Sequence, residues 1–230
     1  MTSSTSTQSV LRRSTLQRLA VLASIAMACL SAASVQAQSA FDRVFEAVEA
    51  NQPAEVRALL ARGIDVNTVD RDGNTLLARA AQRGHREVFT LLLGSGARIE
   101  TRNRFGETPM MYAALGGNEG IVRELIGKQA RINADVPAWT AMHYSALRGH
   151  VGVLALLIDA GGDINAASDN GTTPLMMAAS EGRIEAVALL LQRGADPGRT
   201  TDAGRTASAW ARASGHARIA ERIEAAEKKR

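Results

Sequence analysis

The segment "GTTPLMMAASEGRIEAVALLLQRGADP", residues 171–197, contains the signals for two short helices and for the turns around them. Thr173 and Pro174 can begin a helix, because a threonine side chain caps free N–H groups and a proline in the first turn loses no hydrogen bond. Gly182 can end that helix in the left-handed conformation, which costs glycine little. A second helix would follow and bury Leu189–Leu191. One such unit cannot cover its own apolar face, so we expect it to pack against similar neighbours.

The same pattern recurs along the chain at a nearly constant spacing. A threonine followed nine residues later by a glycine occurs five times, at Thr75, Thr108, Thr140, Thr173 and Thr206. Successive threonines lie 33, 32, 33 and 33 residues apart, and an earlier copy without the threonine covers 44–67. A fixed period of this length predicts a repeat architecture in which each unit packs against the next.

The quoted segment closely resembles the ankyrin repeat pattern, which reads G-x-T-P-L-x-x-A-A and continues with a glycine, a Leu-Leu pair and G-A-D. The resemblance covers about residues 39–225. It implies an all-α repeat solenoid of helix–turn–helix units joined by β-hairpin turns, with about five full repeats and a truncated C-terminal sixth. The expected repeats span about 39–69, 70–102, 103–134, 135–167, 168–200 and 201–230.

Residues 1–37 have the order of a secretory signal peptide: arginines without acids, an apolar run at 19–33, and small residues after it. We expect cleavage between Ala37 and Gln38, which leaves a repeat domain at 38–230. The apolar run is shorter than the roughly 20 residues that span a bilayer, so cleavage is favoured over a membrane anchor. We therefore expect a periplasmic protein with no membrane span after processing. The adjacent Arg12 and Arg13 leave a twin-arginine export route open beside the general one.

Charge argues against a nucleic-acid partner. Three of the 27 basic residues and none of the 23 acidic ones lie in residues 1–37, so the expected mature chain has a net charge of +1. This removes most of the electrostatic attraction to phosphates. The only cysteine, Cys29, also lies in the expected signal peptide, so the mature domain would depend on packing without disulfides.

The stretch "WTAMHYSALRGH", residues 139–150, contains residue types that occur in active sites. His143 and Ser145 are two positions apart on the expected helix and point in different directions. His150 follows the helix-ending glycine, as a histidine does in two other repeats. We interpret all three as structural residues, and Asp70 and Asp72 as turn residues rather than calcium ligands. We expect no catalytic residue, no metal ligand and no cofactor.

The resemblance implies where a partner would bind. In ankyrin repeat proteins the hairpin tips and the exposed side of the first helices form a groove for partner proteins. The positions that correspond are Arg71, Asn74, Arg83, Arg104, Phe105, Glu107, Leu115, Trp139, Leu147, Arg148, Asp169, Asn170 and Glu181. The resulting hypothesis is a non-enzymatic, monomeric protein-interaction module in the periplasm, with an accessory, scaffold, or inhibitor and immunity role. The alternative is an effector delivered to a host cell, where it binds a host protein.

The third and fourth repeats differ from the others in their exposed apolar residues. Phe105, Leu115, Trp139 and Leu147 are large apolar groups at positions where exposure is expected, and arginines surround them. Aromatic and arginine side chains dominate the energetics of protein interfaces. The hairpin before the fourth repeat is one residue short and has Ala138 where a turn glycine is expected. This leaves two orientations open for Trp139: a contact residue at the tip, or a side chain folded down over the shortened turn.

Overall fold

The computed structural model of the chain describes residues 40–134 and 138–229. Residues 46–230 form one compact unit, and the arrangement of helices given below concerns this unit. The expected signal peptide, with Ala37 and Gln38, lies outside the described residues, as do three residues of the shortened hairpin, 135–137. Residues 40–49 are helical.

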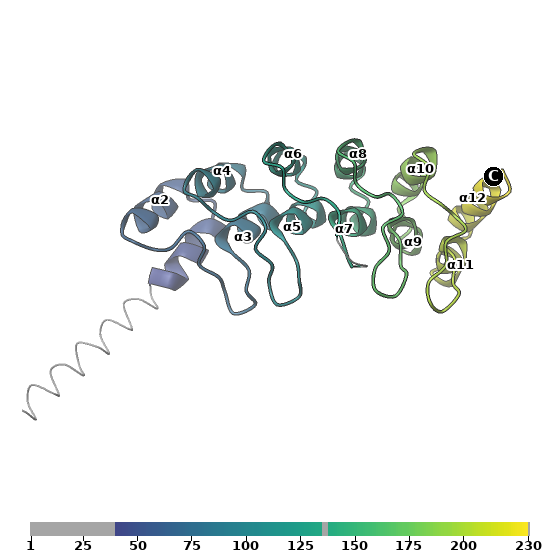
Figure 1. The fold of residues 1–230 in the computed structure, drawn as a ribbon, viewed down its shortest axis with the longest axis horizontal. Coiled ribbons are helices and arrows are strands. Elements are labelled where there is room, and N and C mark those ends of the chain that lie inside the picture. The colour runs from purple at the N-terminus through teal and green to yellow at the C-terminus, as the bar shows by residue number, and fades with distance from the viewer. Residues whose placement is uncertain (1–39, 135–137, 230) are drawn as a thin grey trace, which may run out of the picture. The chain divides into compact units, whose positions relative to one another are not determined.

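The helices form two rows (Figure 1). The first-helix row contains α3 (Leu76–Arg83), α5 (Pro109–Leu115), α7 (Ala141–Arg148), α9 (Pro174–Ser180) and α11 (Ala207–Ala213). The second-helix row contains α2 (Pro53–Ala61), α4 (Arg86–Gly94), α6 (Glu119–Gly127), α8 (Val151–Asp159), α10 (Ile184–Gln192) and α12 (Ala217–Glu227). Each helix packs on the next one in its own row, and α3 to α12 also pack as pairs across the rows. The all-helical solenoid expected from the sequence is confirmed.

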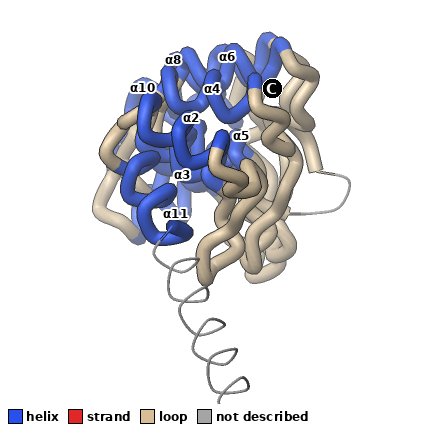
Figure 2. Tube along the Cα trace, turned by 90° about the vertical axis from the view of Figure 1, so that its left-hand side faces the viewer, coloured by secondary structure: helices blue, strands red, loops and turns tan. Residues whose placement is uncertain are grey.

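Long loops connect each helix pair to the next and gather on one side of the stack (Figure 2). Among the described residues these hairpins contain isolated bridges, between Val69 and Thr75 and between Thr200 and Thr206, and no extended strand. Their tips are joined across repeats. The N–H of Arg104 donates to the carbonyl of Asp72 at 3.0 Å, and the N–H of Asp202 donates to the carbonyl of Asn170 at 3.1 Å.

The threonines and glycines of the period begin and end the first helices as expected. The side chains of Thr75, Thr108, Thr173 and Thr206 each accept from the N–H three residues later. The glycines after the helices have positive φ, at Gly84, Gly117, Gly149 and Gly182. In α7 the cap includes a side chain from the helix itself, because Nδ1 of His143 accepts from the N–H of Thr140 at 3.2 Å.

The core lies between the two rows and between successive repeats. Fully buried leucines lie in four of the second helices, at Leu92, Leu125, Leu154, Leu157 and Leu190. Of the expected buried run Leu189–Leu191, only the central residue is fully buried, because the other two face partly outward. Paired alanines in the first helices, such as Ala178 and Ala179, are also buried and allow the helices to approach closely. Within residues 40–134 and 138–229, no helix has the length and apolar content needed to cross a bilayer.

Candidate protein-binding surface

The hairpin of the second repeat, residues 69–75, is held in shape by Asp70. Its Oδ1 accepts from the backbone N–H groups of Asp72 and Asn74 at 2.8 and 2.9 Å, and its Oδ2 forms an ion pair with Arg79 at 2.5 Å. Burial alone would raise the pKa of Asp70, but the hydrogen bonds from Asn74 and Arg79 outweigh it and lower the pKa. The interpretation of Asp70 as a turn residue is confirmed.

A hydrogen-bond network extends from this hairpin across two further repeats. Nδ2 of Asn103 donates to Oδ1 of Asn74 at 2.8 Å and to Oε2 of Glu107 at 2.9 Å. Oη of Tyr112 lies 2.8 Å from both of the same acceptor atoms. Oη of Tyr144, on α7, donates to Oε1 of Glu107. The expectation that Asn74 is exposed is wrong, because the hairpin directs its side chain into this network and leaves it 3% exposed.

Glu107 carries its negative charge at neutral pH. Desolvation would raise the pKa of Glu107, but hydrogen bonds from Tyr144, Asn103 and Tyr112 outweigh it and lower the pKa. Desolvation and the adjacent Glu107 raise the pKa of both tyrosines. The two tyrosine hydroxyl groups therefore remain protonated and can donate to the carboxylate of Glu107 in the third hairpin, residues 103–107.

Trp139 is folded against α7. Its ring centroid lies 5.5 Å from that of Tyr144 and 5.6 Å from that of His143, with both pairs of rings tilted. The side chain is half-buried. Of the two orientations open from the sequence, the structure shows the folded one, in which one part of the ring is packed and the rest faces a groove.

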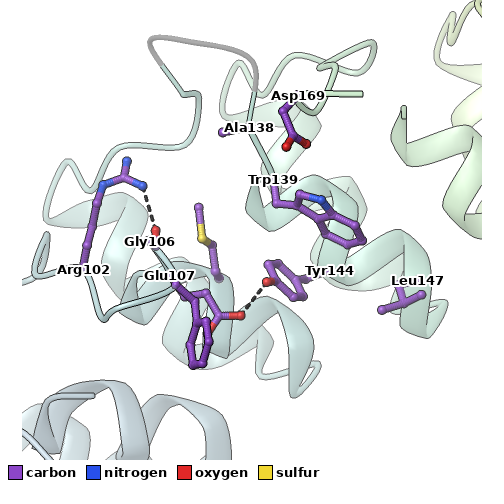
Figure 3. A pocket seen from close by; sticks show the side chains of 10 residues that line it. Arg102, Gly106, Glu107, Ala138, Trp139, Tyr144, Leu147 and Asp169 are labelled. Atoms are coloured by element: carbon purple, nitrogen blue, oxygen red, sulfur yellow. Dashed lines mark hydrogen bonds between the residues drawn. The ribbon is translucent and has the colours of Figure 1, made fainter. Parts of the chain in front are cut away.

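This groove, called here the Trp139 groove, has a volume of about 540 Å³ and lies between the third and fourth repeats (Figure 3). Its lining is mainly apolar and aromatic with a few charged groups: Arg102, Phe105, Gly106, Glu107, Met111, Ala138, Trp139, Tyr144, Leu147 and Asp169. Ligand-binding pockets in proteins have similar sizes and a similar mixture of apolar walls and few polar groups. The groove therefore has the composition of a binding site.

Phe105 forms the exposed rim of the Trp139 groove. Its side chain is 65% exposed, more than that of any other large apolar residue among the described residues. The guanidinium carbon of Arg104 lies 4.7 Å from the ring centroid, and Arg104 pairs with Asp72 of the preceding hairpin at 2.8 Å. The ring is thus mostly exposed, with the guanidinium of Arg104 over it.

Five of the residues expected to bind a partner meet in the Trp139 groove: Phe105, Glu107, Trp139, Leu147 and Asp169. Others lie elsewhere on the surface, and several already have partners. Arg83 pairs with Glu49, and Glu181 lies 3.8 Å from Arg183. The Oδ1 atom of Asn170 accepts within its own hairpin, and Leu115 is half-buried. Arg71, Arg104 and Arg148 are exposed.

Sequence reasoning missed the other five groove residues, Arg102, Gly106, Met111, Ala138 and Tyr144. Tyr144 follows the capping Thr140 by four residues, so it lies one helical turn further along the same face. That spacing was the available signal for it. Met111 reaches the groove from α5 and Arg102 from the loop before the third hairpin, and the repeat period alone does not give these directions.

The candidate catalytic residues of 139–150 have structural roles. His143 is fully buried, and its Nε2 lies 3.0 Å from the carbonyl of Thr172 in the next repeat. Since Nδ1 accepts a backbone N–H, Nε2 must carry the proton, and burial lowers the pKa of His143. Ser145 donates to the carbonyl of Ala141 at 2.8 Å, and Nε2 of His150 lies 3.1 Å from the carbonyl of Leu115. The described residues contain no group of three or more side chains arranged to hold a metal ion.

Comparison with known families agrees with this architecture. A family model described as ankyrin repeats (3 copies) matches residues 95–168, 132–201 and 160–224, and one described as ankyrin repeats (many copies) matches 44–93. Together these matches cover most of the chain. No curated protein matches the chain. Repeats of this kind are generally protein–protein interaction modules and typically non-enzymatic, and no catalytic family is indicated.

Proposed function

The chain belongs to the ankyrin repeat family, and on that basis we propose that it binds a partner protein, as a monomer and without catalysis, through the Trp139 groove. The observation that carries the proposal is the 65% exposure of Phe105 at the rim of an apolar groove. Exposed apolar patches on a protein surface often mark interaction sites, and aromatic residues are enriched among the residues that contribute most to binding.

The groove is suited to binding because its walls are fixed before a partner arrives. Tyr144 is held by Glu107, Trp139 packs on Tyr144, and Phe105 lies under Arg104. Side chains that are already ordered lose little conformational entropy on binding, and more of the contact energy then appears as affinity. A groove with ordered walls of this kind favours binding of a partner protein over catalysis.

The proposal places this binding in the periplasm, in an accessory, scaffold or inhibitor role, and its support is the signal-like sequence of residues 1–37. Cell fractionation with N-terminal sequencing tests the location. We expect a mature chain that begins at Gln38 in the periplasmic fraction. A chain that retains residues 1–37 in the cytoplasm would contradict export, and appearance in a host cell would favour the effector alternative.

Affinity capture from periplasmic extract tests the binding surface. The purified protein is compared with the double variant Phe105→Ala/Trp139→Ala and with the control Ile184→Ala. Ile184 is a suitable control because it is a large apolar residue, 52% exposed, on α10 and outside the groove. We expect the unaltered protein and Ile184→Ala to retain the same specific partner, and the double variant to lose it. Retention by a double variant of unchanged helix content would overturn the assignment of the groove.

A further inference from the structure

The charges in the Trp139 groove are unbalanced. Two carboxylates, Glu107 and Asp169, line it together with one guanidinium, that of Arg102. Nη1 of Arg102 donates to the carbonyl of Gly106 at 2.8 Å. In the part of the chain that the structure describes, neither carboxylate forms an ion pair, although the chain as a whole is basic. The side chains that line the groove therefore carry one more negative than positive charge, and the nearby guanidinium of Arg104 is paired with Asp72.

The carboxylate of Glu107 is fixed but not fully used. Its Oε2 accepts from Asn103 and lies within hydrogen-bond distance of Tyr112, while its Oε1 has the hydroxyl of Tyr144 as its partner. A carboxylate oxygen has two lone pairs, so Oε1 can accept one more hydrogen bond. The hydrogen bonds keep Glu107 charged, so its free acceptor site presents a stable negative charge to a cationic ligand.

The aromatic walls favour the same kind of ligand. The faces of tryptophan, tyrosine and phenylalanine attract cations, and a guanidinium group already lies over Phe105 in this structure. Figure 3 shows Asp169, from the next hairpin, above Trp139, with Tyr144 and Glu107 below it. Both carboxylates line the groove that the indole faces, so a planar cation bound there could pair with them.

We propose that the Trp139 groove receives an arginine side chain of the partner protein, stacked on Trp139 and paired with Glu107 and Asp169. This inference rests on the proposed function and specifies the chemistry of the partner. Arginine fits better than lysine, because its flat guanidinium stacks on aromatic rings and its several N–H donors can reach two acceptors at once.

Nuclear magnetic resonance titration of the full-length protein tests the charge. The probe is the peptide acetyl-Gly-Gly-Arg-Gly-Gly-amide, and the control peptide has citrulline, which is nearly the same shape but neutral, in place of arginine. We expect the arginine peptide to shift the indole N–H signal of Trp139 and to bind about tenfold more tightly than the citrulline peptide. Equal affinities, or no shift with either peptide at about millimolar concentrations, would overturn the inference.

Charge-neutralising variants locate the site. Asp169→Asn alters an exposed side chain, so folding should be unaffected, and Glu107→Gln keeps the size of its side chain. We expect each variant to reduce the preference for arginine over citrulline several-fold. Glu185→Gln is the matched control, since Glu185 is also an exposed carboxylate but lies on α10, outside the groove. A preference that is unchanged in Asp169→Asn and Glu107→Gln would contradict the proposal.

Affinity capture separates this inference from the proposed function. If Phe105→Ala/Trp139→Ala releases the partner while Asp169→Asn and Glu107→Gln retain it fully, the groove binds the partner and the arginine assignment is wrong. If no groove variant releases the partner, both are wrong. Release by the charge variants as well, with Glu185→Gln unaffected, is the result expected here.

Discussion

The first helices of repeats two to four and those of repeats five and six share one backbone fold, but the residue four positions after the capping threonine plays a different role in the two regions. In the earlier region this position contains Arg79, Tyr112 and Tyr144, whose polar ends join a hydrogen-bond network across three repeats. In the later region it contains Met177, which is 8% exposed, and Trp210, whose buried indole N–H has no partner among the described residues.

This difference separates the residues that form the repeat stack from the hydrogen-bond network that occurs in one part of it. Threonine caps, left-handed glycines and buried leucines are the same in both regions, so they account for the fold. The network is present only on the earlier side within the described chain, and it fixes Tyr144 and, through it, Trp139. Variants that break the shared framework should therefore act alike in the two regions, while variants of the network should not.

The largest effect is expected from the framework. Leu125→Ala and Leu190→Ala each remove a fully buried side chain from a second helix, and each should lower the free energy of unfolding by about 2–5 kcal/mol. Urea denaturation measures both, with Arg148→Ala as an exposed control. Because the two leucines occupy the same position in the period, the losses should be similar. A large loss in one region alone would mean that the regions do not share one core.

The next effect distinguishes the regions. Glu107 and Thr172 both precede the capping threonine. Among the described residues, Glu107 is the only acceptor for the hydroxyl of Tyr144, while the hydroxyl of Thr172 bonds to Asn170 in its own hairpin. Glu107→Ala should cost about 1–3 kcal/mol of unfolding free energy, since it leaves half-buried donors unpaired. Thr172→Ala should cost about 1 kcal/mol or less. Equal costs in chemical denaturation would show that the network adds nothing beyond ordinary hairpin bonds.

A smaller effect depends on pH and concerns the third residue of α7 and of α9. His143 and Met176 occupy this position, and burial lowers the pKa of His143 below its ordinary value of 6.5. The unfolded chain then binds this proton more readily than the folded one. Neutral His143 therefore makes its full contribution to the free energy of unfolding above pH 6.5. This contribution decreases as the pH falls from 6.5 toward the pKa of His143 in the folded protein.

His143→Met, which copies the fifth repeat, should remove that part of the pH dependence. Unfolding free energies measured at intervals between pH 7.5 and about pH 5 test this, because the lowered pKa values of Asp70 and Glu107 affect stability only at lower pH. Met176→Leu serves as the control at the corresponding position. Unchanged pH dependence in His143→Met would mean that another group is responsible.

The smallest effect on stability is expected at the rim. Phe105→Ala removes a side chain that is mostly exposed, so it should change the unfolding free energy by about 0.5 kcal/mol or less. Thermal unfolding followed by circular dichroism measures it, with Ile184→Ala as the control on α10. A change as large as that of Leu125→Ala would show that Phe105 is part of the core and not an accessible contact.

The sequence predicted the framework because each of its elements is local. Thr173, Pro174 and Gly182 act through their own turns, and their 33-residue period is visible without any tertiary information. The orientation of Trp139 could not be predicted, because it depends on the rings of Tyr144 and His143 and on a shortened hairpin.

The burial of Asn74 also could not be predicted from the repeat pattern. Its position in the repeat indicates a hairpin tip, but Asp70, Asn103 and Tyr112 together provide polar partners that allow its amide to be buried. These partners come from three different segments of the chain. A repeat pattern gives the backbone position of a side chain, and its neighbours in adjacent repeats decide whether it is exposed.

Amide hydrogen exchange with and without the captured partner tests the central claim most directly. We expect the partner to slow exchange in the third hairpin, around residues 103–107, and in α7, while 199–206 and α12 keep their rates. The Trp139 groove would then be the contact surface. Slowed exchange confined to repeats five and six, or to the second-helix row, would contradict it.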